Sequence, residues 1–143
     1  MNIEEVAADL RRTLLVSARI LRSHTASEYL TAPQFSVLAF LYRRGESTPS
    51  QVAAFEHVSA PVMSRMLDRL EQSGWVQRRQ HPEDGRQVLA SLTDQGRAQV
   101  EQCRRERDQW LRERLADADE RELALIAEAN EVLVRLLLRT PPH

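Results

Sequence analysis

The spacing of apolar residues along the chain predicts long helices at both of its ends. From Asn2 to about Ser23, apolar positions recur every three or four residues with charged residues between them, which is typical of an amphipathic helix. At ~1.5 Å per residue this helix would span roughly 33 Å, which is longer than one small core needs. Thr93 precedes a second long helical pattern that ends near Leu115, and Asp119 precedes a last, leucine-rich one.

Three shorter helices are predicted between these ends from their capping residues. Residues 31–34 and 48–51 each place a threonine three positions before a glutamine, which is the pattern of a capping box at a helix start. Ser59 is a third predicted cap, with a proline in the turn that follows it. Gly45 and Gly74 are the expected ends of the first and third of these helices.

After the third short helix the pattern changes from helical to alternating. Residues 75–80 and 87–92 are predicted strands, and residues 81–86 have the composition of a turn. The fold class is therefore mainly α with a small β-hairpin. The order of helix, helix, short turn, helix and hairpin is that of a winged helix-turn-helix core.

Composition and charge limit the possible functions without selecting one. The chain has 143 residues, a formal net charge of −1 and a single cysteine, so it lacks the basic excess that many nucleic-acid binders show. No apolar run reaches the ~20 residues of a membrane span, and we expect no membrane partner. The sequence has no glycine-rich phosphate loop or nucleophile elbow, and its four histidines have no metal-ligand spacing. We therefore expect neither an enzyme nor a cofactor.

The case for DNA binding depends on local pattern. The second helix of a helix-turn-helix lies in the major groove, where its N-terminal residues approach base edges and arginine pairs with guanine. A hairpin arginine can enter the minor groove beside it. The capping residues of the preceding helix could add phosphate contacts. On this basis, the candidate DNA-binding residues are Thr48, Ser50, Gln51, Ser59, Ala60, Pro61, Val62, Ser64, Arg65, Arg69, Arg78, Arg79, Asp84 and Arg86.

Several of these residues also have a purely structural interpretation. Arg65 and Arg69 could be ordinary solvated charges on a helix surface. Thr48 and Gln51 are most simply a capping box. Arg69 could form a surface pair with the adjacent Asp68, and such a pair contributes little to stability. Asp84 and Arg86 could form an ion pair within their loop, although a hairpin tip favours an outward position.

Several segments resemble the MarR family of bacterial repressors. The resemblance covers residues 31–97 and is carried by LTAPQFSVLAFL, TPSQVAAFEHVSAPVMSRMLDRLEQSGWVQRR and HPEDGRQVLASLTDQGR. It implies a homodimer that binds a pseudo-palindromic operator, with residues 61–65 in the major groove. It also implies that Asp84 orients Arg86 toward DNA. Gly85 departs from the arginine common in the family, which implies one phosphate contact fewer and a looser hairpin tip.

The resemblance also implies a domain organisation and a ligand. We expect a single domain over residues 1–143, with a DNA-binding lobe at 31–97 and helical dimerisation regions at 1–30 and 98–143. The implied effector is a small molecule, often an aromatic acid, bound near the first, second and fifth helices. The candidate lining residues are Arg19, His24, Phe35 and Tyr42, of which the first two could meet a carboxylate. A regulator of this kind is expected in the cytoplasm, with the nucleoid.

Two alternatives remain open from the residues. The near-neutral charge is compatible with a winged-helix adaptor that binds another protein and never binds DNA. A redox-sensing regulator is the second alternative, because Arg104 and Arg105 adjoin Cys103 and could lower its pKa. Against it, related oxidant sensors carry their cysteine near the start of the first helix, whereas Cys103 lies near the end of the chain.

Overall fold

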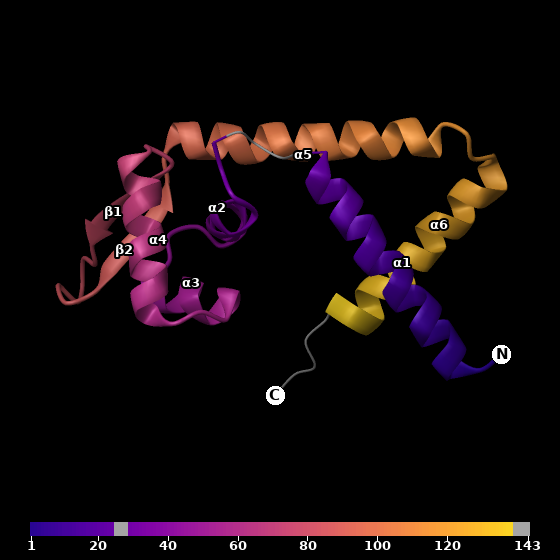
Figure 1. Cartoon of the computed structure of the whole chain (residues 1–143), viewed down its shortest axis with the longest axis horizontal. Coiled ribbons are helices and arrows are strands. Elements are labelled where there is room, and N and C mark those ends of the chain that lie inside the picture. The colour runs from indigo at the N-terminus through magenta and orange to yellow at the C-terminus, as the bar shows by residue number, and fades with distance from the viewer. Residues whose placement is uncertain (25–28, 139–143) are drawn as a thin grey trace. The chain divides into compact units, whose positions relative to one another are not determined.

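A computed structural model describes residues 1–24 and 29–138 of the chain, and they form a mainly helical fold with one antiparallel hairpin (Figure 1). The chain divides into two compact units, residues 1–107 and 108–143. In chain order the elements are α1 (Ile3–Ser23), α2 (Ala32–Arg44), α3 (Pro49–Glu56), α4 (Ala60–Gln72), β1 (Val76–Gln80), β2 (Val88–Leu92), α5 (Asp94–Leu115), α6 (Glu120–Leu133) and the π-helical turn η1 (Val134–Leu138). The predicted fold class is confirmed, whereas the boundaries of the DNA-binding lobe and dimerisation regions stay predictions.

The predicted helix boundaries are confirmed by the geometry of the caps. Thr31 begins α2 with a complete capping box, and Gly45 ends that helix with φ of 77°. Gly74 follows α4 with φ of 82°, a left-handed conformation that favours glycine. The hairpin differs slightly from its prediction, because β1 and β2 each begin one residue later than the alternating pattern suggests.

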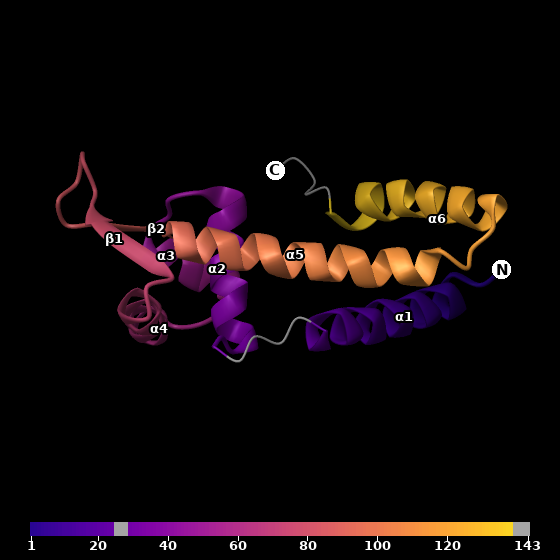
Figure 2. The same ribbon diagram turned by 90° about the horizontal axis from the view of Figure 1, so that it is seen from above.

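The core of the first unit lies where α2, α3 and α4 pack with the hairpin (Figure 2). β1 and β2 pair in register from Val76 opposite Leu92 to Gln80 opposite Val88. Ser47 adds a single antiparallel bridge to Ala90, so the loop before α3 is fastened to the hairpin. The largest fully buried side chains are Leu38, Leu41, Met63, Leu67, Leu70, Val37, Val52, Val76 and Val100.

Neither the N-terminal helix nor the described part of the second unit, residues 108–138, contains a buried residue. α1 has none, although its apolar residues follow the predicted helical spacing. α6 begins after Asp119 as predicted, with a capping box formed by Asp119 and Glu122, and it also buries nothing. Its last turn continues as the π-helical η1, which the sequence pattern does not indicate. None of the described helices is both long and apolar enough to cross a membrane.

Candidate nucleic-acid interface

Two N-terminal helix caps and one left-handed residue set the limits of α3 and the start of α4. The Thr48 hydroxyl accepts a hydrogen bond from the Gln51 backbone N–H at 3.2 Å, and the Gln51 side chain accepts one from Thr48 N–H at 2.9 Å. His57 ends α3 with φ of 55° and ψ of 41°. The Ser59 hydroxyl then accepts from Val62 N–H at 3.4 Å and begins α4. The capping roles of Thr48 and Gln51 are therefore confirmed, and phosphate contact by them stays a prediction.

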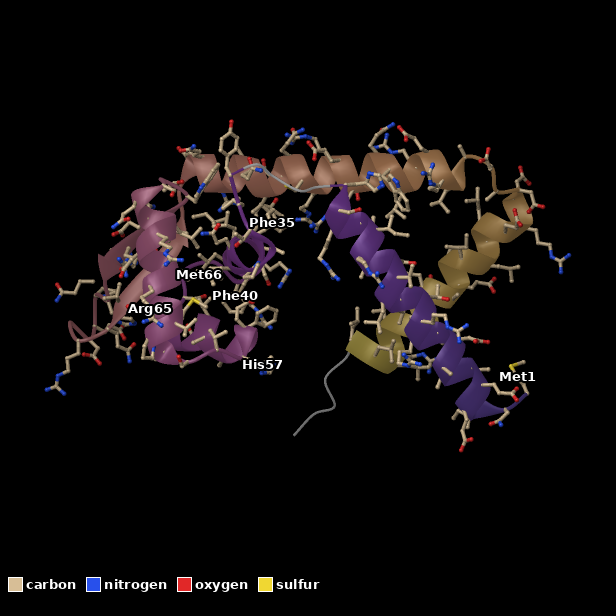
Figure 3. All side chains as sticks on the ribbon, in the orientation of Figure 1. Met1, Phe35, Phe40, His57, Arg65 and Met66 are labelled. Carbon is tan, nitrogen blue, oxygen red and sulfur yellow. The ribbon has the colours of Figure 1, made fainter. Side chains whose placement is uncertain are left out.

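Helix α4 has one face in the core and one face in solvent. Met63, Leu67 and Leu70 recur at helical spacing and are fully buried, which fixes the rotation of the helix about its axis. Arg65 lies on the other side of the helix, where Figure 3 labels it. The exposed residues of this stretch include all the predicted contacts, namely Ser59, Ala60, Pro61, Val62, Ser64, Arg65 and Arg69.

The hairpin tip is an ordered loop. Asp84 Oδ1 accepts a hydrogen bond from the backbone N–H of Arg86 at 3.1 Å, as in an Asx turn. The Gln80 side chain donates to the Gly85 carbonyl at 2.8 Å. Asp84 thus acts on the backbone that carries Arg86, whose side chain is exposed.

Arg78 and Arg79 lie on β1 in ion pairs. Arg78 bridges to Asp68 and, at 3.2 Å, to Glu71, both on α4. The hydrogen bond with Glu71 is the main cause that raises the Arg78 pKa, with Asp68 adding to it against the effect of burial. Asp68 is thus a partner of Arg78, and its predicted pairing with the adjacent Arg69 is wrong because packing of β1 on α4 brings Arg78 to it.

The second of these arginines ties the hairpin to a different element. Arg79 binds both carboxylate oxygens of Glu46, at 2.8 to 3.1 Å, in the loop before α3. Its hydrogen bond to Glu46 raises the pKa of the Arg79 guanidinium. These three ion pairs hold β1 against α4 and against the loop before α3. A role for either arginine in contacting DNA stays a prediction.

Two hollows lie next to these elements within the first unit. One has a volume of about 560 Å³ and borders the exposed face of α4; its lining residues are Thr31, Pro33, Gln34, Val62, Arg65, Met66 and Arg69. The other has a volume of about 160 Å³ between α2 and α5; its lining residues are Phe35, Ala39, Tyr42, Arg43, Val100, Arg104 and Arg107.

The smaller hollow brings together two of the four predicted ligand-binding residues. The Arg107 guanidinium lies 4.9 Å from the centre of the Phe35 ring, and that of Arg104 lies 5.0 Å from the centre of the Tyr42 ring. Arg19 and His24 are not among its lining residues, and their role stays a prediction. Sequence reasoning missed Arg104 and Arg107, although their three-residue spacing on one predicted helix places them on a common face.

The environment of Cys103 corrects one expectation. The thiol is buried, with 2% of the residue exposed, and burial followed by the charge of Glu106 raises its pKa. The predicted lowering of this pKa by Arg104 and Arg105 is wrong, because burial outweighs the opposing effects of the Arg107 charge and the Gln99 hydrogen bond. Arg104 lies over the Tyr42 ring, and Arg105 donates to the side chain of Gln102 at 2.8 Å.

No metal-binding cluster is formed by the histidine, cysteine, aspartate and glutamate residues in the part of the chain that the structure describes. His143, the last of the four histidines considered above, lies outside the described residues.

Comparison with known proteins adds to this geometry. The MarR family profile matches residues 30–88. The chain is 35% identical, over 136 residues and 95% of both chains, to an uncharacterized helix-turn-helix-type transcriptional regulator of Mycobacterium bovis. It is 37% identical to the multiple antibiotic resistance protein MarR of Salmonella typhimurium over 97 residues, which cover 68% of this chain and 67% of that protein.

Solved structures agree with these sequence relatives. The crystal structure of ligand-free MarR from Escherichia coli superposes with a TM-score of 0.73 at 28% identity, covering 94% of this chain and 97% of that one. A Pseudomonas aeruginosa protein described as a candidate transcriptional regulator superposes with a TM-score of 0.82 at 31% identity, covering 95% and 96% of the two chains. The chain belongs to the MarR family of winged helix-turn-helix transcriptional regulators.

Proposed function

We propose that this protein is a repressor that binds a pseudo-palindromic operator as a homodimer, with α4 of each copy in the major groove and each hairpin tip in the adjacent minor groove. The observation that carries this proposal is the division of α4 into a fully buried face and an exposed face that contains Arg65. A helix whose rotation is fixed by its core can present the same side chains to every operator it meets.

The exposed residues of α4 suit distinct parts of the groove. Arg65 can donate two hydrogen bonds to guanine, and the small apolar groups of Ala60, Pro61 and Val62 can approach thymine methyl groups. Ser59 and Ser64 supply hydroxyls that can bond to bases or phosphate. The N-terminus of α3 is oriented by the capping box of Thr48 and Gln51, and there Ser50 offers its backbone N–H and its hydroxyl to a phosphate.

The hairpin contributes in two ways under this proposal. Arg86 is the exposed guanidinium at the tip that enters the minor groove. Arg78 and Arg79 position the hairpin, because their ion pairs hold β1 to α4 and to the loop before α3. Their substitution should therefore weaken DNA binding by displacing the hairpin.

A homodimer explains the apolar surface of the terminal helices. α1 exposes Ile3, Leu14, Leu15 and Ile20 to at least 38%, and a surface of this kind is usually covered by a partner. α6 and η1 expose a second such surface. A two-fold dimer would place its two recognition helices about one turn of DNA apart, ~34 Å.

The proposal includes a small effector that releases the operator. The hollow between α2 and α5 combines the aromatic rings of Phe35 and Tyr42 with the guanidiniums of Arg104 and Arg107. Rings and cations together suit an aromatic carboxylate, in agreement with the class implied by the family resemblance. Because the proposed target is chromosomal DNA, the protein is expected in the cytoplasm with the nucleoid.

The test begins with selection of bound fragments from random duplex DNA, followed by affinity measurements at two salt concentrations. Affinity should fall steeply as salt rises, because phosphate contacts release counterions. Arg65→Ala should weaken binding to the selected duplex by ~1–3 kcal/mol. Arg105→Ala is the matched control, since it removes the same charge from α5, where Arg105 bonds to Gln102.

Two outcomes would contradict the proposal. If no duplex is enriched at low salt, the proposed DNA binding is wrong. The alternative of a winged-helix adaptor would then be favoured, and it also agrees with the near-neutral net charge of −1. If a duplex is enriched but Arg65→Ala binds it as tightly as the Arg105→Ala control does, the assignment of α4 to the major groove is wrong.

A further inference from the structure

His81 occupies a position at the start of the hairpin tip that neither the sequence patterns nor the proposed function explains. Its imidazole Nδ1 accepts hydrogen bonds from two backbone N–H groups, those of Glu83 and Asp84, each at 3.1 Å. Its own backbone N–H donates to the Gln87 carbonyl at 2.9 Å across the loop. The side chain is half-buried. One imidazole nitrogen therefore organises the first half of the tip.

The two donors dictate the protonation state of the ring. A backbone N–H can only donate, so a nitrogen that accepts from two of them carries no proton. The ring is then neutral, with its proton on Nε2. Histidine is the side chain that ordinarily changes charge between about pH 5 and pH 8. When Nδ1 takes a proton it becomes a donor, and both hydrogen bonds are lost.

The same loop places the arginine of the tip. Asp84, whose N–H donates to His81, accepts from the N–H of Arg86 through its carboxylate. Loss of the imidazole bonds removes two of the hydrogen bonds that fix the backbone just before Arg86. The bonds from Gln87 N–H to the Asp84 carbonyl and from Gln80 to the Gly85 carbonyl remain, so the turn that carries Arg86 is loosened and not unfolded. The other charged groups of the hairpin are Glu83, next to Asp84, and the arginines of β1, which are paired with Glu46, Asp68 and Glu71.

We propose that His81 is a positioning residue for Arg86 and makes the contribution of the hairpin to DNA binding depend on pH. With the ring neutral, the bonds to Glu83 and Asp84 hold the first half of the tip and position the turn before Arg86. With the ring protonated, both bonds are lost and Arg86 is held less firmly. The DNA half of this inference rests on the proposed function, whereas the effect on the loop does not.

Two substitutions separate protonation from the mere presence of a side chain. His81→Asn keeps a hydrogen-bond acceptor that can bond to the backbone two residues on, and it does not titrate. Its tip should stay closed at every pH. His81→Ala removes the acceptor, so its tip should be open at every pH. Neither change touches a buried core residue.

The first measurement follows the backbone amide signals of Glu83 and Asp84 by NMR between pH 5.5 and pH 8, without DNA. In the native protein both signals should shift in parallel with the His81 ring. In His81→Asn they should not follow a histidine titration. Carboxylates ordinarily titrate near pH 4 and stay charged throughout this range. If the native amides stay constant while the ring titrates, the proposal is wrong.

The second measurement compares native protein with Arg86→Ala on the selected duplex at both pH values. At pH 8 the substitution should weaken binding about tenfold, and at pH 5.5 less than about threefold. On the His81→Asn background the loss should be about tenfold at both values. On the His81→Ala background it should be small at both. Comparing ratios within one pH removes the effects of the other histidines and of overall charge.

The two measurements test separate parts of the proposal. An Arg86→Ala effect that is equal at both pH values in the native protein would overturn the link between His81 and DNA binding. If no duplex binds at all, the proposed function fails, and the NMR titration still decides whether His81 closes the tip.

Discussion

At the scale of single residues, arginines that look alike in the sequence have different surroundings in the fold. Arg65 is exposed on α4, whereas Arg78 is held between Asp68 and Glu71. The chain positions of these residues do not predict the pairing, because Arg78 reaches the two acids only after β1 packs beside α4. Local pattern predicted which residues lie on the interface elements, but it could not predict which guanidiniums stay unoccupied by acids.

Cys103 leads to a prediction at this scale. Burial raises the pKa of its thiol, so the reactive thiolate is scarce at neutral pH and becomes appreciable only as pH approaches that raised value. In the native protein the thiol should react with a disulfide reagent at least about tenfold more slowly than in the urea-unfolded chain. The rate of reagent release, followed by absorbance, measures this.

Cys103→Ser tests whether the thiol has a role in DNA binding or in a response to oxidants. The variant should bind the selected duplex as the native protein does, with and without peroxide. Peroxide-induced release that is present in the native protein and absent in Cys103→Ser would instead support the redox-sensing alternative.

At the scale of elements, the sequence signals that correctly predicted helix starts involve residues close together in the chain. The capping boxes at Thr31 and Thr48 each concern residues three positions apart and are present as predicted, and a third begins α6 at Asp119, where a helix start was predicted. Such signals depend on backbone hydrogen bonds within one turn and not on the rest of the fold. The close approach of α5 to the end of α4 was not predicted, because it depends on packing between segments about 20 residues apart.

Gly96 marks that approach. A Cβ atom added at Gly96 would lie 2.1 Å from the Trp75 carbonyl oxygen, a backbone atom. Thr93 fastens the same corner, donating to the Gly74 carbonyl at 2.6 Å and accepting from Gly96 N–H at 3.0 Å. The rigid contact explains a glycine in the first turn of α5, where helix propensity alone would favour alanine by about 1 kcal/mol.

Gly96→Ala should therefore lower the free energy of unfolding by about 1–3 kcal/mol, despite the better helix propensity of alanine. Urea unfolding followed by circular dichroism measures the change. Gly85→Ala is the matched control, because an added Cβ there would meet only the end of the Gln80 side chain, at 3.1 Å. A Gly96→Ala protein as stable as the native one would show that α5 can shift away from Trp75 at little cost.

At the scale of the whole molecule, the unanswered question in one protomer is what covers its apolar ends. The second unit exposes apolar side chains along α6 and η1 to between 38% and 74%. They are Leu123, Leu125, Ile126, Val132, Val134, Leu136, Leu137 and Leu138. The leucine-rich pattern predicted this surface from the sequence, and under the proposed function a second copy of the chain covers it.

The proposed dimer yields a prediction about association. Leu136 is 64% exposed within one protomer, so a charge there costs one chain little but would be buried in a dimer interface. Leu136→Arg should raise the dimer dissociation constant at least about tenfold, measured by sedimentation, and weaken operator binding with it. Glu128→Arg, which places the same charge on exposed α6, is the control. A native protein that sediments as a monomer at every concentration would contradict the proposed dimer.

The last prediction joins the hollow between α2 and α5 to release of DNA. Its volume of about 160 Å³ is close to that of an engineered cavity, about 150 Å³, that holds benzene. Benzoate should therefore enter with its ring between Phe35 and Tyr42 and its carboxylate near Arg104. It can dissociate the operator only if it binds the DNA-free form more tightly than the bound form, and DNA must then weaken benzoate binding by the same factor.

Arg104→Ala tests this coupling, and Arg105→Ala is its neighbour and control. The first variant should need about tenfold more benzoate for half-release, because a charge-assisted contact is lost, while its affinity for DNA without benzoate stays close to native. Benzamide, which has the ring without the charge, should release poorly. Fluorescence anisotropy of the labelled duplex measures all of these. Equal benzoate sensitivity in the two variants would place the effector elsewhere, and the larger hollow beside α4, which contains Arg65 and Arg69, would be the next site to test.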